Sequence, residues 1–347
     1  MAMETDHSVQ EFTMTCYSLS PFNRTVAATL IAVGVLPPGL AAGQTKQQLD
    51  WCVNRHHIYS WDQQIAGCRA AINSSRLSRQ NLAICYSNRA AAYGRKGEDD
   101  HDIADATQAI RLYPKLSEAY INRGSGYLGK GDLDRAFTEY NQAIQLDAKS
   151  WIGFFNRGNA YMVKGDLDRA IADYGDSIRF NPKFSRAYFR RGIANLYSGL
   201  LPEALSDLNQ SSAVDRKFAY TAVWLYILSK RSNLPSGLAE ATTQLDMKAW
   251  PAPVVALYLG QMTLEAVLAA ADDRDAHIKK SRVCQANFYA GELELQRGAK
   301  DEATRLFRLV VADCPKDEVE RLAANAELKM LSVITGNQTP QSETESH

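Results

Sequence analysis

The residues of this chain best suited to covalent chemistry are its six cysteines. Cys52 and Cys68 are expected on either side of one helical hairpin, and Cys284 and Cys314 at positions one and thirty-one of a later one. Because the two ends of an antiparallel hairpin meet, the second pair can form a disulfide, and we expect one from the first pair too. Closing loops of this size stabilises a fold by roughly 3 kcal/mol and needs an oxidising compartment. We therefore predict the disulfides Cys52–Cys68 and Cys284–Cys314; buried thiols are the alternative for each pair.

Two cysteines remain outside these pairs. Cys16 falls in a segment that we expect to be removed, and Cys85 is expected early in a helix as a small core residue. A metal site is the competing hypothesis for the first pair, because His56 and His57 follow Cys52 closely. Adjacent histidines on a helix point about 100° apart, so only one of them could join Cys52 on one face. No second ligand pair follows at the spacing of a structural zinc site, and we expect neither a metal nor a cofactor.

A glycine-rich stretch at 124–131 reads Gly-Ser-Gly-Tyr-Leu-Gly-Lys-Gly and imitates a phosphate-binding loop. A functional loop of this kind lies between a strand and a helix and places Ser or Thr after its lysine. Here Gly131 follows the lysine, and the segment falls inside an expected helix. No other nucleotide, nucleophile-elbow or His-Glu-x-x-His motif is visible, so we do not expect an enzyme.

The charged residues argue against nucleic-acid binding and supply candidates for an alternative function. The chain has 39 basic and 39 acidic residues, and this zero net charge gives no electrostatic footprint for nucleic acid. An enzyme with a hidden site is the alternative function, with its candidates in an irregular segment. They are Asp272, Asp273, Asp275 and His277, for which a solvated helix end is the simpler interpretation.

The elements that carry these residues repeat every 34 residues, in frames that begin at 83, 117, 151 and 185. Each frame has an aromatic residue at position four, a small residue at position eight and a glycine at the end of its first half. The sequence Gly-Asp-Leu-Asp-Arg-Ala occurs twice, at 131–136 and 165–170. The aromatic residues are Tyr86, Tyr120, Phe154 and Tyr188, the small residues are Ala90, Gly124, Gly158 and Gly192, and the glycines are Gly97, Gly131, Gly165 and Gly199.

This pattern is similar to the tetratricopeptide repeat (TPR), whose unit is a pair of antiparallel helices. The resemblance implies an all-α fold: an α-solenoid of TPR helical hairpins with N- and C-terminal capping helices. Small residues let the two helices of a hairpin approach closely, and large aromatic side chains fill the space between hairpins. Because such solenoids have an extended concave surface, the resemblance predicts a groove that binds peptide segments of protein partners.

The first helix of each TPR lines the groove, which selects the candidate binding residues. The predicted partner-binding residues are Asn122, Phe155, Asn156, Asn159, Arg186, Phe189 and Arg190. The asparagines could bond a peptide main chain, and the two arginines, one turn apart, could bind a carboxylate. With Asn156, the arginines match part of the clamp that some TPR domains use for a C-terminal carboxylate, but Ile121 and Ser125 stand at its other positions. The alternatives are that the asparagines serve helix packing and that the arginines are solvated or pair with acidic neighbours.

The first forty-odd residues do not fit the repeats. An apolar run over 25–36 is preceded by Arg24 and followed by two prolines and the small-residue stretch 39–42. This is the layout of a secretory signal peptide, and the run is too short to span a bilayer. We predict a signal peptide over 1–42, with a true start at Met14 as a variant and a buried first helix as the alternative. An exported protein would be periplasmic or secreted.

The register of the repeat divides the rest of the chain. We expect an N-terminal helical hairpin over 43–82, four TPR repeats over 83–218 and an irregular helical segment over 219–283. A fifth TPR-like repeat over 284–317 and a capping helix over 318–335 precede a disordered tail over 336–347. Within the irregular segment the predicted helices are 220–230, 238–247, 252–261 and 263–271.

The second half is similar to one family of TPR proteins, the periplasmic NlpI-type adaptors. The resembling stretches include Ala222-Val-Trp-Leu-Tyr-Ile-Leu, Trp250-Pro-Ala-Pro-Val-Val-Ala-Leu-Tyr and Asn287-Phe-Tyr-Ala-Gly, and the similarity covers roughly residues 80–332. Members are non-enzymatic scaffolds that bring cell-wall hydrolases and a periplasmic protease together, often as homodimers. They are lipid-anchored through a cysteine at the signal cleavage site, and no cysteine stands near Ala42.

The resemblance therefore implies a non-enzymatic scaffold with protein partners and without a stable membrane anchor. Cell-envelope hydrolases or proteases are the partners that it suggests, and a homodimer is consistent with it. A structural protein that dimerises through exposed aromatic residues is a further alternative.

Overall fold

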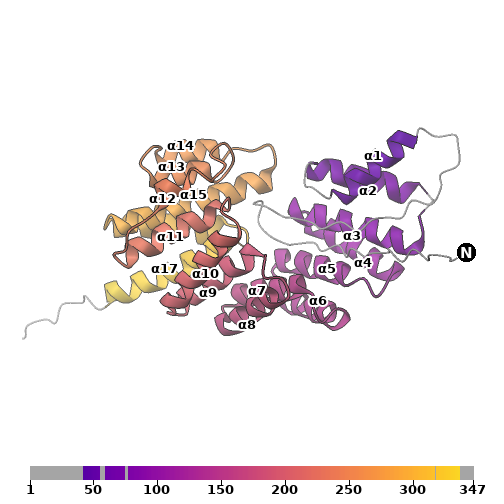
Figure 1. The fold of residues 1–347 in the computed structure, drawn as a ribbon, viewed down its shortest axis with the longest axis horizontal. Coiled ribbons are helices and arrows are strands. Elements are labelled where there is room, and N and C mark those ends of the chain that lie inside the picture. The colour runs from indigo at the N-terminus through magenta and orange to yellow at the C-terminus, as the bar shows by residue number, and fades with distance from the viewer. Residues whose placement is uncertain (1–41, 55–58, 75–76, 317, 337–347) are drawn as a thin grey trace, which may run out of the picture. The chain divides into compact units, whose positions relative to one another are not determined.

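The computed structural model describes residues 42–54, 59–74, 77–316 and 318–336 (Figure 1). Every regular element in these ranges is a helix, and none of their residues forms a strand, which confirms the predicted all-α fold. The predicted signal peptide up to residue 41, Cys16, His56, His57 and the tail from residue 337 lie outside the described residues. Among the described helices, none is long and apolar enough to cross a membrane.

The described helices fall into two compact units, which divide between Asn156 and Arg157. This division lies inside one helix, α7 (Trp151–Lys164). Unit 1 comprises the described residues up to 156, and unit 2 comprises those from 157 to 336.

Unit 1 is a row of helices in which, from α1 to α6, each helix packs on the next one along the chain (Figure 1). A short turn separates the two helices of the hairpins α3–α4 and α5–α6, as the 34-residue period requires. The helices are α1 (Ala42–Val53), α2 (Trp61–Asn73), α3 (Arg79–Arg95), α4 (Asp99–Leu112), α5 (Ser117–Lys130), α6 (Leu133–Leu146) and the first part of α7.

The first hairpin begins its second helix with a capping box. The Ser60 hydroxyl accepts a hydrogen bond from the N–H of Gln63, and the Gln63 side chain accepts one from the N–H of Ser60. These two bonds satisfy donors that the first turn of a helix leaves without partners. The two helices also touch closely, because a Cβ on Gly67 would lie 2.5 Å from the carbonyl oxygen of Gln48.

The glycine-rich stretch at 124–131 is part of a helix and not a phosphate-binding loop. Its first seven residues lie in α5, and Gly131 ends the helix with φ +80°, a left-handed conformation that glycine adopts without strain. Gly124 serves the packing of the hairpin: a Cβ there would lie 2.8 Å from Cε1 of Tyr140 in α6. The small residue at position eight thus makes room for the aromatic residue of the second helix.

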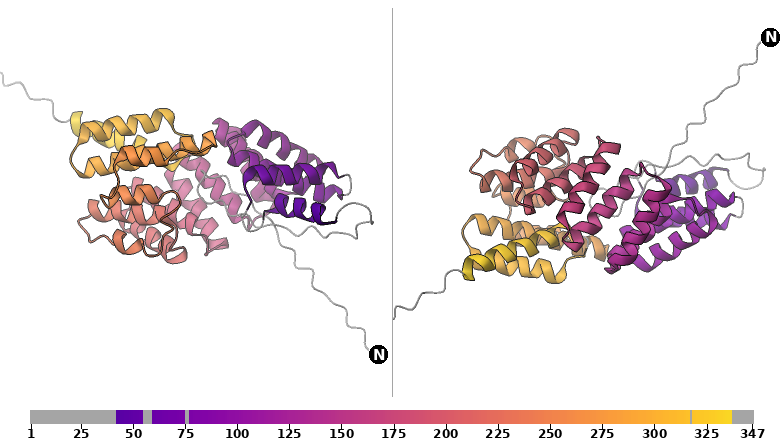
Figure 2. Two further views of the ribbon diagram at one scale, coloured as in Figure 1. Left: turned by 90° about the horizontal axis from the view of Figure 1, so that it is seen from above. Right: turned by 90° about the horizontal axis from the view of Figure 1, so that it is seen from below.

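Unit 2 begins with three helices and a half that continue the same repeat. It then passes through shorter helices and closes with a hairpin and a last helix, which lie side by side in both views of Figure 2. The helices after α7 are α8 (Leu167–Phe180), α9 (Ser185–Tyr197), α10 (Leu201–Val214), α11 (Ala219–Arg231), α12 (Leu238–Ala241), α13 (Ala252–Tyr258), α14 (Leu264–Ala270), α15 (Ala276–Gln296), α16 (Lys300–Asp313) and α17 (Val319–Gly336).

Three helix boundaries in the irregular segment differ from the prediction. The helix predicted over 252–261 ends at Tyr258. The helix predicted over 238–247 ends at Ala241, where the hydroxyls of Thr242 and Thr243 donate to main-chain carbonyls three residues back and compete with the helix. The first helix of the fifth repeat begins at Ala276 and not at residue 284. It starts early because the Asp275 side chain accepts hydrogen bonds from two N–H groups of its first turn.

The core of unit 2 centres on Trp224 of α11, which is fully buried. Its indole Nε1 donates to the hydroxyl of Tyr289 at 3.0 Å, and its ring lies 5.6 Å from that of Phe288. Both partners belong to α15, so this cluster joins two helices about 65 residues apart in sequence. Aromatic pairs of this kind stabilise a core beyond the area that they bury.

Both predicted cysteine pairs are disulfides in the structure. The Cα atoms are 4.4 Å apart in Cys52–Cys68 and 5.2 Å apart in Cys284–Cys314. Cys85 is a free thiol that packs in the same apolar cluster as the first disulfide. Burial raises the pKa of this thiol to about 12, against a smaller opposing effect of Arg89, so the reactive thiolate is scarce.

Candidate functional site

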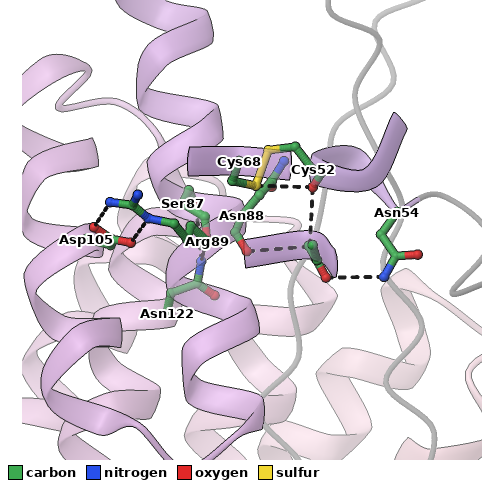
Figure 3. Close-up of a disulfide and its surroundings, with 9 residues drawn as sticks. Cys52, Asn54, Cys68, Ser87, Asn88, Arg89, Asp105 and Asn122 are labelled. Atoms are coloured by element: carbon green, nitrogen blue, oxygen red, sulfur yellow. Dashed lines mark hydrogen bonds and ion pairs between the residues drawn. A yellow bond between two sulfur atoms is a disulfide. The ribbon is translucent and has the colours of Figure 1, made fainter. Parts of the chain in front are cut away.

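The first disulfide lies beside polar side chains that join consecutive hairpins (Figure 3). The Gln64 side chain of α2 donates to the main-chain oxygens of Cys52 in α1, at 3.3 Å, and of Asn88 in α3, at 3.5 Å. It also accepts from Nδ2 of Asn54 at 3.3 Å. Buried polar groups need such partners, and here they bind three helices to one another.

Asn122, predicted to bind a partner's main chain, bonds within unit 1 instead. Its Nδ2 donates to the main-chain oxygen of Ser87 at 2.9 Å and to the Ser87 hydroxyl at 3.0 Å (Figure 3). Asn122 is 4% exposed, so this amide is committed to packing α5 against α3. The helix-packing alternative describes this residue.

Phe155 and Asn156, at the end of unit 1, are fully buried. Neither amide atom of Asn156 has a hydrogen-bond partner among the described residues. A buried amide without partners costs free energy, which makes Asn156 the polar residue of the predicted set that packing explains least. A role for either residue in binding a partner stays a prediction.

Asn159, Arg186 and Phe189 are buried in unit 2. The Asn159 side-chain oxygen accepts a hydrogen bond from the Tyr174 hydroxyl at 2.8 Å. The Arg186 guanidinium lies 5.7 Å from the ring centre of Phe218, and the Phe189 ring meets the same ring edge-on at 5.2 Å. Phe218 therefore packs against two of the predicted binding residues and holds α9 to the start of α11.

Arg190 is buried and lies near the C-terminal helix of unit 2, and a role for it in binding a partner stays a prediction. Burial raises the pKa of Glu320 in α17, and the charge of Arg190 opposes that rise. Glu320 also accepts a hydrogen bond from the Tyr289 hydroxyl at 3.2 Å, and Glu327, two turns later in α17, accepts one from Tyr197 in α9 at 3.2 Å. These two glutamates are 2% exposed, so the capping helix turns part of its charge inward and not to solvent.

Arg231 of α11 ties the same helix to α15. Its Nη2 donates to Glu292 of α15 at 2.6 Å and to Glu327 of α17 at 2.7 Å. Burial raises the pKa of Glu292 to about 7, against the opposing charge of Arg231. One guanidinium thus serves two buried carboxyl groups, and this arrangement binds three helices at one point.

All four repeats contain the same ion pair, which was not predicted from the sequence. An arginine at position seven of each frame binds an acidic residue 16 positions later, in the second helix of the same hairpin. The sequence does indicate this pair, because arginine stands at position seven in every frame. The pairs, with their shortest distances, are Arg89–Asp105 at 2.6 Å, Arg123–Glu139 at 2.9 Å, Arg157–Asp173 at 2.7 Å and Arg191–Asp207 at 2.7 Å.

The candidates for a hidden enzyme site are engaged at the start of α15. Asp275 caps the helix by accepting from the N–H of His277 at 2.9 Å, and its two acidic neighbours form ion pairs with cations of the same helix. No group of three or more His, Cys, Asp or Glu side chains among the described residues could hold a metal ion. The ion pairs are Asp272–Lys279 at 2.8 Å and Asp273–Arg282 at 2.9 Å.

Helical hairpins that stack in sequence order and share one template define an α-helical repeat protein. Comparison with known families names the repeat: residues 124–165 match the TPR repeat family model, and residues 155–218 match the tetratricopeptide repeat family model. This part of the chain is therefore built of tetratricopeptide repeats, as its sequence predicted. TPR arrays are in general surfaces for binding other proteins.

Solved structures of TPR proteins are similar to this chain over much of its length. The Thermus thermophilus protein TTC0263 is 16% identical, with 52% of this chain and 95% of that chain covered and a TM-score of 0.47. A tetratricopeptide repeat protein from Parabacteroides merdae is 14% identical, with 84% and 100% covered and a TM-score of 0.47. PilF from Pseudomonas aeruginosa is 14% identical, with 72% and 99% covered and a TM-score of 0.46.

Proposed function

We propose that this chain is an exported, non-enzymatic TPR adaptor that binds peptide segments of protein partners in the periplasm or outside the cell. The observation that carries the proposal is the pair of disulfides, one in the first hairpin and one in the α15–α16 hairpin. Disulfides persist in oxidising compartments, so their presence in a repeat scaffold supports an extracytoplasmic site of action. The signal-like run over 25–36 supports export independently.

The resemblance to NlpI-type adaptors suggests the class of partner, namely cell-envelope hydrolases or proteases. In such a role the scaffold supplies a surface and the partner supplies the chemistry. A rigid array of hairpins suits this task, because binding then orders little of the scaffold itself.

Two measurements test this proposal. Cell fractionation of the natural host, followed by thiol labelling under denaturing conditions, should find the protein outside the cytoplasm with only Cys85 labelled among residues 43–347. Cytoplasmic protein with labelled Cys284 and Cys314 would refute the export part.

Binding is tested by photo-crosslinking in living cells. A photoreactive amino acid replaces Glu118, a half-buried residue of α5 that the repeat template places on the inner face, and a comparison variant carries it at Gln145, an exposed position on α6. We expect crosslinks to a defined set of proteins from position 118 and few from position 145. Equal crosslinking from the two positions would contradict binding on the inner face of the repeats.

A further inference from the structure

One cavity of unit 2 lies on elements that contribute none of the predicted groove residues. It has a volume of about 670 Å³ and is bounded by the end of α11, the end of α13 and the C-terminal half of α15. A space of this size accommodates several residues of a peptide or a small ligand. The side chains of Tyr226, Lys230, Glu292, Gln296 and Arg297 are among those that line it.

Two cations of this cavity favour an anion, and the Glu292 carboxyl that also lines it is paired with Arg231. Lys230 is exposed and forms no ion pair with any described residue. Arg297 pairs only with Glu294, at 2.6 Å, and more than half of the Arg297 side chain is exposed, so a ligand can compete for it. Arg231 is already held by Glu292 and Glu327, which leaves Lys230 and Arg297 as the cations available to a ligand.

The cavity also has an aromatic and apolar wall. The rings of Tyr226 and Tyr258 meet edge-on at 5.2 Å, and the Tyr258 hydroxyl donates to the main-chain oxygen of Tyr289 at 2.8 Å. That bond fixes the ring of Tyr258, so the wall is rigid. Leu257 and Leu293 complete it with apolar surface.

Two polar atoms in the lining residues have no hydrogen-bond partner among the described residues. They are Oε1 of Glu292 and Nε2 of Gln296, which lie one turn apart on α15. Glu292 is fully buried, and a buried acceptor without a partner is costly. One residue of an extended peptide presents its N–H and its C=O to the same side and can satisfy an acceptor and a donor together.

We propose that this cavity is a second peptide site, which takes an extended acidic segment from the interior of a partner protein. An acidic side chain of the segment binds Lys230 and Arg297, its apolar neighbours pack on Tyr226 and Tyr258, and its main chain bonds Glu292 and Gln296. This inference rests on the proposed function, because it names the chemistry of one kind of partner segment. It places that segment on α11 and α15, which contribute none of the predicted groove residues.

Synthetic pentapeptides blocked at both ends test the site. The probe is acetyl-Ala-Leu-Glu-Leu-Ala-amide, and its binding to the full chain is measured by isothermal titration beside the same peptide with glutamine in place of glutamate. We expect the glutamate peptide to bind about tenfold more tightly, because a charge-assisted contact exceeds a neutral one. Lys230→Glu, Arg297→Glu and Tyr226→Ala should each weaken binding by at least about tenfold.

The matched control is Lys280→Glu, an exposed lysine of α15 that does not line the cavity. It should leave the affinity unchanged. Equal binding of the two peptides, equal loss in the control, or binding that requires a free peptide carboxylate would each overturn the proposal. Crosslinking at position 118 reports on the adaptor function separately: if it succeeds while the probe fails to bind, only the second site is refuted.

Discussion

Arg157 donates hydrogen bonds to both carboxylate oxygens of Asp173, with Nε 2.8 Å from Oδ2 and Nη2 2.7 Å from Oδ1. The two residues lie in the two helices of one hairpin, α7 and α8, and Asp173 is 5% exposed. Burial raises the pKa of Asp173 against the opposing effect of Arg157. The pair therefore fixes the hairpin in one arrangement and keeps a buried charge compensated.

Removal of this arginine should destabilise the repeat array strongly. We expect Arg157→Ala to lower the free energy of unfolding by roughly 2–3 kcal/mol, because it leaves a buried carboxylate without its partner. Arg169→Ala is the control: Arg169 pairs with Asp166 at the exposed start of α8, where solvent screens an ion pair and it contributes little. Urea denaturation followed by circular dichroism measures both variants, and equal losses would contradict the structural role of the buried pair.

Replacing the glycine at position eight of the third repeat with alanine should destabilise the protein. A Cβ on Gly158 would lie 2.8 Å from Cε1 of Tyr174, a ring that is fully buried and cannot move aside. We expect Gly158→Ala to cost roughly 1–3 kcal/mol through overpacking, despite the better helix propensity of alanine.

Gly175 of α8 provides the matched control for that substitution. A Cβ there would meet only Nη1 of Arg191, at 3.6 Å, which is ordinary contact. Gly175→Ala should therefore stabilise the protein by roughly 0.5–1 kcal/mol, measured in the same denaturation experiment. Two changes of the same sign would show that propensity, and not the contact with Tyr174, decides the effect.

The repeat template predicted the helices of 83–218 because each of its residue types has a local reason, such as Gly131 at a left-handed helix end or Gly124 beneath an aromatic ring. The inward side of α17 could not be predicted in this way. Glu327 is buried because Tyr197 and Arg231 bind it, and these residues come from other helices, 130 and 96 positions away in the sequence. A pattern read along one helix assigns such a glutamate to solvent, since charged residues are rarely buried without partners.

The ion pairs between positions seven and twenty-three of each repeat were partly predictable from the sequence. Their periodicity is visible in the sequence, but only the antiparallel packing of the two helices shows that positions 16 apart meet. Arg186 and Arg190 differ from these ion pairs. The template places both arginines at inner positions, but in the structure Arg186 lies against Phe218 and Arg190 lies near α17.

The second disulfide should contribute strongly to unit 2. Cys284→Ser with Cys314→Ser opens a loop whose ends are 30 residues apart, and we expect a loss of roughly 3 kcal/mol by the chain-entropy estimate. Thermal unfolding with and without a reductant measures the effect. In this double variant the reductant should shift the melting temperature less than in the natural protein, because only Cys52–Cys68 remains to be reduced. Identical shifts would show that the second disulfide adds no stability.

Glu292 should make the stability of unit 2 depend on pH near neutrality. Its folded-state pKa is raised from 4.5 to about 7, chiefly by burial, so the folded protein resists an ionisation that the unfolded chain undergoes readily. The stabilising contribution is complete below pH 4.5 and is lost as the pH rises through 7.

The comparison that isolates this residue is Glu292→Gln, which cannot ionise. The free energy of unfolding of the natural protein should fall relative to that of the variant between pH 5 and pH 8, by on the order of 2 kcal/mol. Glu320, whose pKa burial also raises, is present in both proteins and cancels in the difference. Glu203→Gln, an exposed position on α10, is the control for the loss of a negative charge. If the curves of the natural protein and Glu292→Gln run parallel over this range, Glu292 is ionised in the folded state throughout, and Arg231 outweighs the cost of its burial.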